Sequence, residues 1–146
     1  MTIPTTELGT GPAACRPTRG GGAPANSAGL LLAAWTAFVV YVTLLPFRFT
    51  ADLGGAAAKV RSLAGVLDRP VSRSDVAGNV LLFAPWGLAF AARRAGSGTG
   101  LAATVVTGAA GGLALSSAVE VLQLFEPGRV ASPLDLAANT AGAALG

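Results

Sequence analysis

Apolar residues form three long, nearly uncharged stretches, separated by short segments rich in Gly, Pro and charged residues. The first stretch covers residues 29–47 and carries no charge. As a helix it would reach about 28 Å, close to the thickness of a hydrocarbon core. Pro46 and Phe47 are typical of the end of a span at the membrane interface. The run is long for a signal sequence and no clear cleavage site follows, so it predicts an uncleaved membrane span.

Two further stretches predict antiparallel spans at 76–93 and 101–124. Arg93 and Arg94 close the earlier of these two, and a Gly-rich turn at 96–100 connects it to the later one. Pro85 lies midway along the 76–93 stretch and predicts a kink. The loop between the first and second spans, residues 48–74, contains a segment, 56–67, that could form a short surface helix.

The last apolar segment begins at residue 135 and is too short for a complete span. Its twelve or so residues would rise about 18 Å, so either the chain is truncated, which we favour, or its last helix penetrates only partway. We therefore expect an all-α integral membrane bundle of about four transmembrane helices, the last incomplete. Residues 1–28 predict a disordered tail because Gly, Pro and Thr dominate them, and residues 29–146 form the membrane domain.

A polar motif, R-x-x-S-x-x-D-x-A-x-N, occurs twice, at 69–79 and 129–139. In each copy Asp and Asn are four residues apart, so they share one face at the start of a helix. Because spans alternate in direction, both copies and the end of the 101–124 span are expected on the same side of the membrane. Lys and Arg counts on the two sides leave the orientation of the bundle open.

The 101–124 span also carries a polar end. Gly108, Gly112, Ser116 and Glu120 follow one another at intervals of four, which predicts a helix contact face of small residues. That explanation does not cover Glu120, because a carboxylate inside a span is costly unless it is paired or reaches water. We expect Arg129, in the short following turn, to lie between Glu120 and Asp135 and to keep both acids ionised.

Composition narrows the function further. The chain has 146 residues, of which 52% are hydrophobic and only 12% charged, with a net charge of +3. Because no basic patch is interleaved with aromatic residues, we expect no nucleic-acid partner. There is no histidine, and Cys15 is the only cysteine, so a Ser-His or Cys-His catalytic pair is excluded and we expect no metal or cofactor.

Three interpretations of the polar residues remain. They could be helix caps and interhelical hydrogen bonds in a structural scaffold. They could instead line a ligand pocket, or belong to a membrane hydrolase or transferase with Asp135 or Glu120 as base, or with the carboxylates holding a divalent cation. No nucleophile is evident, so the sequence favours binding over catalysis. The candidate ligand-binding residues are Asp75, Asn79, Glu120, Gln123, Arg129, Asp135 and Asn139.

The ordered motifs resemble the VanZ-like family of membrane proteins. The matching pieces are Leu44-Leu-Pro-Phe47, then Asp75-x-x-x-Asn79-x-x-x-Phe83-x-Pro85-x-Gly87, then Glu120-x-x-Gln123, Arg129 and Asp135-x-x-x-Asn139-x-x-Gly142. The resemblance covers roughly residues 30–146. It implies a multi-pass protein of a bacterial cytoplasmic membrane that affects susceptibility to the glycopeptide teicoplanin. The partners to expect are membrane lipid and a cell-wall precursor or glycopeptide.

Overall fold

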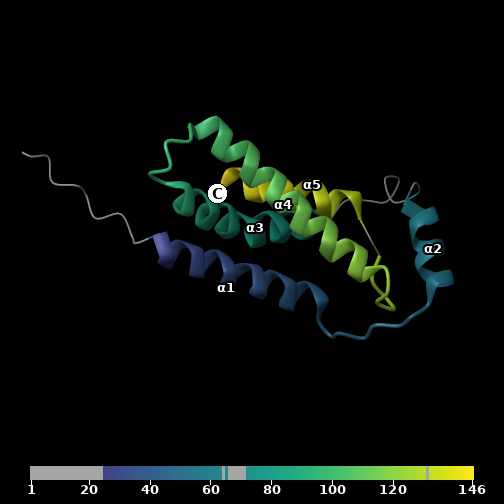
Figure 1. The fold of residues 1–146 in the computed structure, drawn as a ribbon. Helices are drawn as coiled ribbons and strands as arrows, with labels where there is room; N and C mark the ends of the chain where they lie inside the picture. The colour runs from purple at the N-terminus through teal and green to yellow at the C-terminus, as the bar shows by residue number, and fades with distance from the viewer. Residues whose placement is uncertain (1–24, 64, 66–71, 131) are drawn as a thin grey trace, which may run out of the picture.

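The structure, a computed structural model, describes residues 25–63, 65, 72–130 and 132–146, and these residues form helices and connecting turns without a strand. The helices are α1 (Ala25–Leu44), α2 (Leu53–Ser62), α3 (Arg73–Arg94), α4 (Leu101–Gln123) and α5 (Pro133–Leu145). Successive long helices run in opposite directions along one bundle, while α2 lies apart at one end (Figure 1). The predicted all-α bundle is confirmed.

Three of the helices are long and apolar enough to cross a membrane. The candidate spans cover Ser27–Leu44, Arg73–Arg94 and Leu101–Gln123. Helix α5 has 13 residues, so it rises only about 20 Å and falls short of a full crossing. It supplies the predicted fourth, incomplete helix of the bundle.

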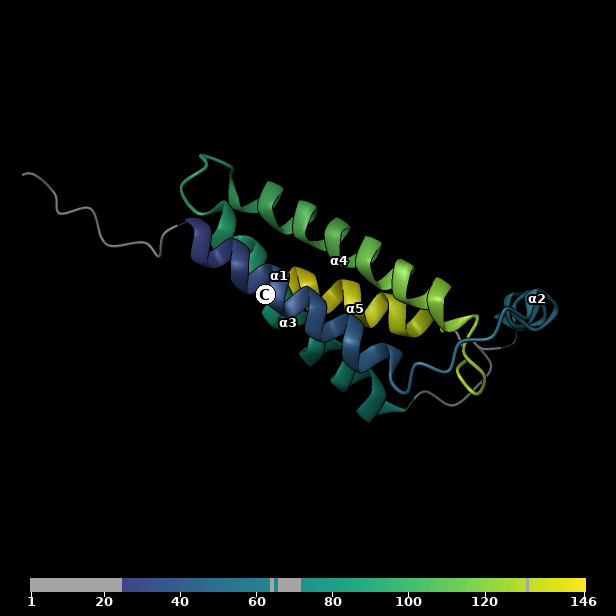
Figure 2. The ribbon, with the colours of Figure 1, turned by 60° about the horizontal axis from the view of Figure 1, so that its bottom comes forward.

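Helix α5 packs between α3 and α4, and glycines permit the close approach (Figure 2). A side chain at Gly112 of α4 would collide with the Cβ of Ala143, and one at Gly87 of α3 would collide with the Ala143 carbonyl. On α5 itself, Gly142 lies against the backbone of Val80. The small residues predicted as a helix contact face are therefore the surface on which α4 receives α5.

Helix α1 packs on the outer side of α3 and is held there by two tryptophans. The indole N–H of Trp35 donates to the carbonyl of Leu82 at 2.9 Å, and that of Trp86 donates to the hydroxyl of Thr36 at 2.9 Å. Buried Val39, Phe83, Trp86 and Ala143 form the core between the helices. The ring of Trp86 is buried and that of Trp35 is partly buried, and each indole N–H has a hydrogen-bond acceptor.

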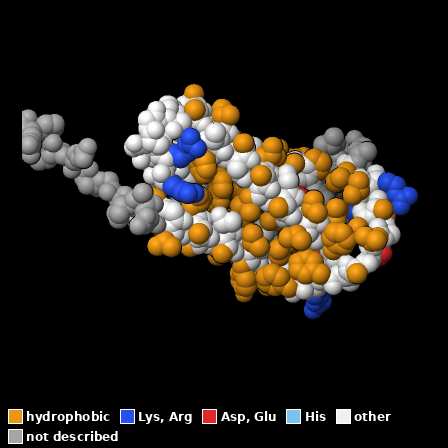
Figure 3. Space-filling model, viewed as in Figure 1, with side chains coloured by type: hydrophobic (Ala, Val, Ile, Leu, Met, Phe, Trp, Pro, Cys, Tyr) orange, Lys and Arg blue, Asp and Glu red, His pale blue; other side chains and the backbone are white. Residues whose placement is uncertain are grey.

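The outer surface of the bundle is apolar. Leu81 of α3, Leu101 and Val106 of α4 and Leu30 of α1 are each more than 60% exposed. Hydrophobic side chains cover much of the face seen in Figure 3. Such a surface suits lipid as the surrounding medium, in agreement with the three candidate spans.

Several predicted boundaries need correction. Helix α1 begins at Ala25 inside the segment predicted to be disordered and ends at Leu44, since the chain turns at Leu45 and Pro46. Helix α2 begins at Leu53, before the predicted 56–67 segment, because the carboxylate of Asp52 accepts the N–H of Gly55 at 2.9 Å and caps it. The disorder predicted for residues 1–24 concerns a segment outside the described residues. Pro85, where a kink was predicted, lies within α3, which is helical from Arg73 to Arg94.

Candidate functional site

The polar segments meet at one end of the bundle, where α1 and α4 end and α3 and α5 begin (Figure 1). The loop after α1 is tied to the turn after α4, because the N–H of Thr50 donates to the carbonyl of Phe125 at 2.8 Å. On α2, the ammonium of Lys59 donates to the carbonyl of Glu126 at 2.6 Å. The two loops predicted to share a side are therefore in direct contact.

A cavity of about 340 Å³ opens at this end. Its walls come from α1, α3, α4, α5 and the turn between α4 and α5. Six of the seven predicted site residues line it: Asn79, Glu120, Gln123, Arg129, Asp135 and Asn139. Residues sixty positions apart in the sequence thus surround one space.

The two copies of the repeated motif are not equivalent. In the first copy Ser72 caps α3, its hydroxyl accepting the N–H of Asp75 at 3.4 Å, and Asp75 is exposed and outside the cavity lining. The structural interpretation thus holds for Ser72 and Asp75. Arg69 falls outside the described residues. Among the described residues of the first copy Gly78 and Asn79 line the cavity, whereas the second copy contributes Arg129, Val130, Asp135 and Asn139.

Glu120 lies within the last turn of α4 and is half-buried. Its Oε2 accepts the backbone N–H of Ser132 at 3.1 Å, and Ser132 is the N-cap residue of α5. The hydroxyl of Ser132 makes no cap hydrogen bond, and the Glu120 carboxylate satisfies a different donor, the N–H of the N-cap residue itself. A negative charge at a helix N-terminus is also stabilised by the helix dipole.

Asn139 and Ser116 form the deep polar wall, and both are buried. The side-chain amide of Asn139 donates to the hydroxyl of Ser116 at 2.8 Å, which joins α5 to α4. The amide oxygen of Asn139 has no hydrogen-bond partner among the described residues. One polar group at the cavity therefore has unused hydrogen-bonding capacity.

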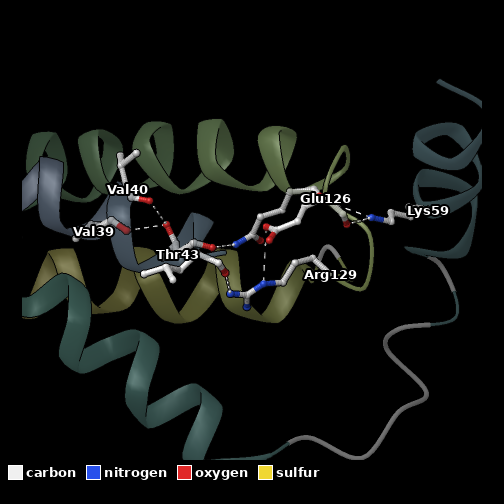
Figure 4. Close-up of polar contacts among 8 residues, drawn as sticks. Val39, Val40, Thr43, Lys59, Glu126 and Arg129 are labelled. Carbon is white, nitrogen blue, oxygen red and sulfur yellow. Dashed lines mark hydrogen bonds and ion pairs between the residues drawn. The ribbon is translucent and has the colours of Figure 1, made fainter. Parts of the chain in front are cut away.

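Arg129 does not occupy the predicted position between Glu120 and Asp135. Its Nη2 donates to the carbonyl of Leu45 at 3.1 Å, and its Nε lies 4.0 Å from a carboxylate oxygen of Glu126 (Figure 4). The prediction was wrong about the partner because the turn directs Arg129 toward the end of α1. Arg129 nevertheless lines the cavity.

Glu126 is the residue that sequence reasoning missed. It lies in the turn after α4 and is only 1% exposed. The Glu126 carboxylate forms an ion pair with the Arg129 guanidinium at 4.0 Å, and the Glu126 carbonyl accepts a hydrogen bond from the Lys59 ammonium (Figure 4). A charged residue beside Pro-Gly is typical of an exposed turn, so no local signal indicated its burial.

Gln123 fixes the end of α1 to the end of α4. Its side-chain amide donates to the carbonyl of Thr43 at 2.8 Å (Figure 4). The Thr43 hydroxyl bonds back to the carbonyls of Val39 and Val40, at 2.7 and 3.3 Å. Gln123 therefore has a structural contact as well as a place in the cavity wall.

Asp135 lies in the first turn of α5, which is outside the three candidate spans. Burial raises the pKa of its carboxyl group, and the negative charge of Asp75 adds to this rise. The amide of Asn79 and the positive charge of Arg129 act in the opposite direction and do not overcome it. Arg129 thus acts in the expected direction on the pKa of Asp135, but burial has the larger effect.

The cavity offers hydrogen-bonding groups of several kinds. Its lining combines carboxylates, side-chain amides and one guanidinium, which together can accept and donate several hydrogen bonds. Ser116 already pairs with Asn139, an amide that cannot act as a base. Among the described residues no group of three His, Cys, Asp or Glu side chains lies close enough together to hold a metal ion.

These features define a multi-span helical membrane protein with a polar cavity at one end of its bundle. The sequence model of the VanZ/LLP1 family matches residues 25–146 of this chain. The match covers all five helices, and the chain belongs to this family. No curated protein and no solved structure matches the chain.

Proposed function

We propose that this protein resides in a bacterial cytoplasmic membrane and binds a cell-envelope component in its polar cavity, without catalysing a reaction. The ligand class is a lipid-linked or peptide-bearing cell-wall precursor, and binding changes the access of glycopeptides such as teicoplanin. One observation carries the proposal: six charged or amide side chains from three helices and a turn line a single cavity of about 340 Å³. Apolar residues would line a membrane bundle at lower cost.

The chemistry of the cavity suits a ligand with both charged and amide groups. The Arg129 guanidinium can engage a phosphate or a carboxylate. Asn79, Gln123 and Asn139 offer amide groups, and the carboxylates of Glu120 and Asp135 accept N–H and O–H donors. Phosphate, carboxylate and amide groups all occur in lipid-linked peptide precursors.

The two competing functions make different demands on the same residues. A hydrolase or transferase that forms a covalent intermediate needs a nucleophile beside its base, whereas the one hydroxyl side chain that lines the cavity, that of Thr43, donates to the carbonyls of Val39 and Val40. A structural scaffold needs every polar group to be paired within the protein, whereas the Asn139 amide oxygen has no partner among the described residues. Ligand binding requires neither a nucleophile nor complete internal pairing.

Teicoplanin susceptibility tests the proposal in cells that express the wild type or a variant at matched protein levels. Asp135→Asn is the informative substitution, since burial already disfavours the ionised form and the neutral amide should keep the fold. Asp75→Asn is its matched control, because Asp75 holds the same position in the first motif and is exposed. We expect reduced susceptibility with the wild type and with Asp75→Asn, and its loss with Asp135→Asn.

The outcomes separate the alternatives. A wild type that leaves susceptibility unchanged would remove the glycopeptide part of the proposal. If cells with Asp135→Asn and with the wild type were equally susceptible to teicoplanin, the cavity would have no part in the function. Glu120→Gln keeps hydrogen-bond acceptance at Ser132 but cannot act as a base. A phenotype that survives Glu120→Gln therefore contradicts acid–base catalysis by Glu120.

A further inference from the structure

The opposite end of the bundle carries a second cavity, of about 380 Å³, lined by Phe90, Arg93, Arg94 and Ser97. It lies where α3 ends and the turn to α4 begins. Basic side chains gather next to hydrophobic ones at this end of the bundle (Figure 3). None of these residues contributes to the polar cavity described above.

The side chain of Arg94 is held in a defined orientation. Its guanidinium carbon lies 5.8 Å from the centre of the Phe90 ring, and Phe90 stacks in turn on Trp86 with ring centres 5.6 Å apart. Its Nη2 donates to the hydroxyl of Thr99 at 3.2 Å. A guanidinium fixed by an aromatic ring and a hydroxyl loses little freedom when it binds an anion.

The turn after α3 brings hydroxyl groups to the same place. Gly96 and Gly98 adopt positive φ values of 86° and 74°, a backbone conformation that glycine adopts readily. Between and after them, the hydroxyls of Ser97 and Thr99 lie 2.6 Å apart in a hydrogen bond. The cavity thus offers neutral donors beside two guanidinium groups.

No described carboxylate neutralises these arginines. The acidic residues of the described chain all belong to the α2 cap, the starts of α3 and α5, the end of α4 and the turn after it: Asp52, Asp75, Glu120, Glu126 and Asp135. The single ion pair among the described residues joins Arg129 to Glu126 at that other end. The positive charges of Arg93 and Arg94 therefore have no counter-ion in the described part of the protein.

We propose that this cavity binds the phosphate of an anionic membrane phospholipid. The two arginines are the last residues of a candidate membrane span, and the end of such a span is expected at the level of the lipid phosphates. Arg93 and Arg94 pair with the phosphate oxygens, and the Ser97 hydroxyl donates to the same group. A zwitterionic headgroup is disfavoured, because its ammonium would meet two guanidinium groups and no described carboxylate.

Native mass spectrometry of the full chain in detergent tests whether this cavity binds an anionic phospholipid. The protein is titrated with phosphatidylglycerol and, separately, with phosphatidylcholine. We expect tighter binding of phosphatidylglycerol by the wild type. The double variant Arg93→Gln/Arg94→Gln should bind it about thirtyfold more weakly, from roughly 1 kcal/mol per basic residue. The matched control Arg48→Gln/Arg61→Gln removes two exposed charges at the other end and should bind like the wild type.

A second variant keeps the test valid if the double variant fails to fold. Arg93→Gln changes an exposed side chain and should by itself weaken phosphatidylglycerol binding about fivefold. Equal binding of the two lipids by the wild type would overturn the proposal, as would unchanged selectivity in Arg93→Gln and the double variant. Displacement of phosphatidylglycerol by equimolar inorganic phosphate would also overturn it, because the site would then recognise free phosphate rather than lipid.

Discussion

At one end of the bundle all the described acidic residues gather, and several of them are partly or fully buried. At the other end Arg93 and Arg94 stand without a described carboxylate, on a turn held by Ser97 and Thr99. The buried Glu126 and the half-buried Glu120 each have a polar partner, the Arg129 guanidinium for Glu126 and the N–H of Ser132 for Glu120. The comparison indicates an internal site at the first end and a lipid-facing site at the second.

The largest expected loss of stability comes from disrupting the contact between α4 and α5, on which both ends of the bundle depend. Gly112→Leu places a side chain against Ala143 in the contact between α4 and α5. Overpacking there should lower the free energy of unfolding by about 3 kcal/mol. Thermal melting in detergent measures this loss. Gly29→Leu serves as control, since a Cβ at Gly29 meets nothing within 4 Å, and a similar loss there would contradict the packing account.

A smaller loss of stability is expected when the ion pair between Arg129 and Glu126 is removed. Arg129→Ala leaves the buried Glu126 carboxylate without its partner. The Arg129 side chain is 45% exposed, so solvent screening reduces the cost to about 1–2 kcal/mol of unfolding free energy. Detergent melting should show the loss, and adding Glu126→Gln should recover part of it. Arg129→Ala melting like the wild type, with full activity, would show that this pair is not central to the site.

The smallest expected effect concerns the hydrogen bond between the side chains of Asn139 and Ser116. A double-mutant cycle with Asn139→Ala and Ser116→Ala should give a coupling free energy of about 0.6–1.7 kcal/mol, the range for interhelical hydrogen bonds in membrane proteins. Melting of the wild type, both single variants and the double variant supplies the four values. Additive losses would show that the 2.8 Å contact contributes nothing specific to the acidic end.

Hydropathy and span alternation predicted much of this arrangement. An apolar stretch long enough to cross the membrane is visible in the sequence, and alternation places 48–74 and 126–134 on one side. The i, i+4 spacing also predicted that the Asp and Asn of each motif share a helix face. These are local or topological properties, so a single sequence carries them.

The partners of individual charges could not be predicted in the same way. Glu126 belongs to a turn whose composition indicates exposure, and only the packing of the α1 end and of Lys59 against that turn buries it. Arg129 was within reach of several acids, and the path of the turn selected Glu126 and the carbonyl of Leu45. The unequal roles of Asp75 and Asp135 arise because α5 lies between two helices while the start of α3 is exposed.

Cysteine accessibility in intact cells tests most directly whether the polar residues form a cavity open to one membrane face. Asn79→Cys, Val130→Cys and Ser97→Cys are introduced singly into a Cys15→Ser background and treated with a membrane-impermeant thiol reagent. Asn79 and Val130 line the cavity, and Ser97 lies at the opposite end. We predict that Asn79→Cys and Val130→Cys react from the same side and Ser97→Cys from the other. Reaction of the first two from opposite sides, or an unreactive Asn79→Cys beside a reactive Val130→Cys, would contradict the account.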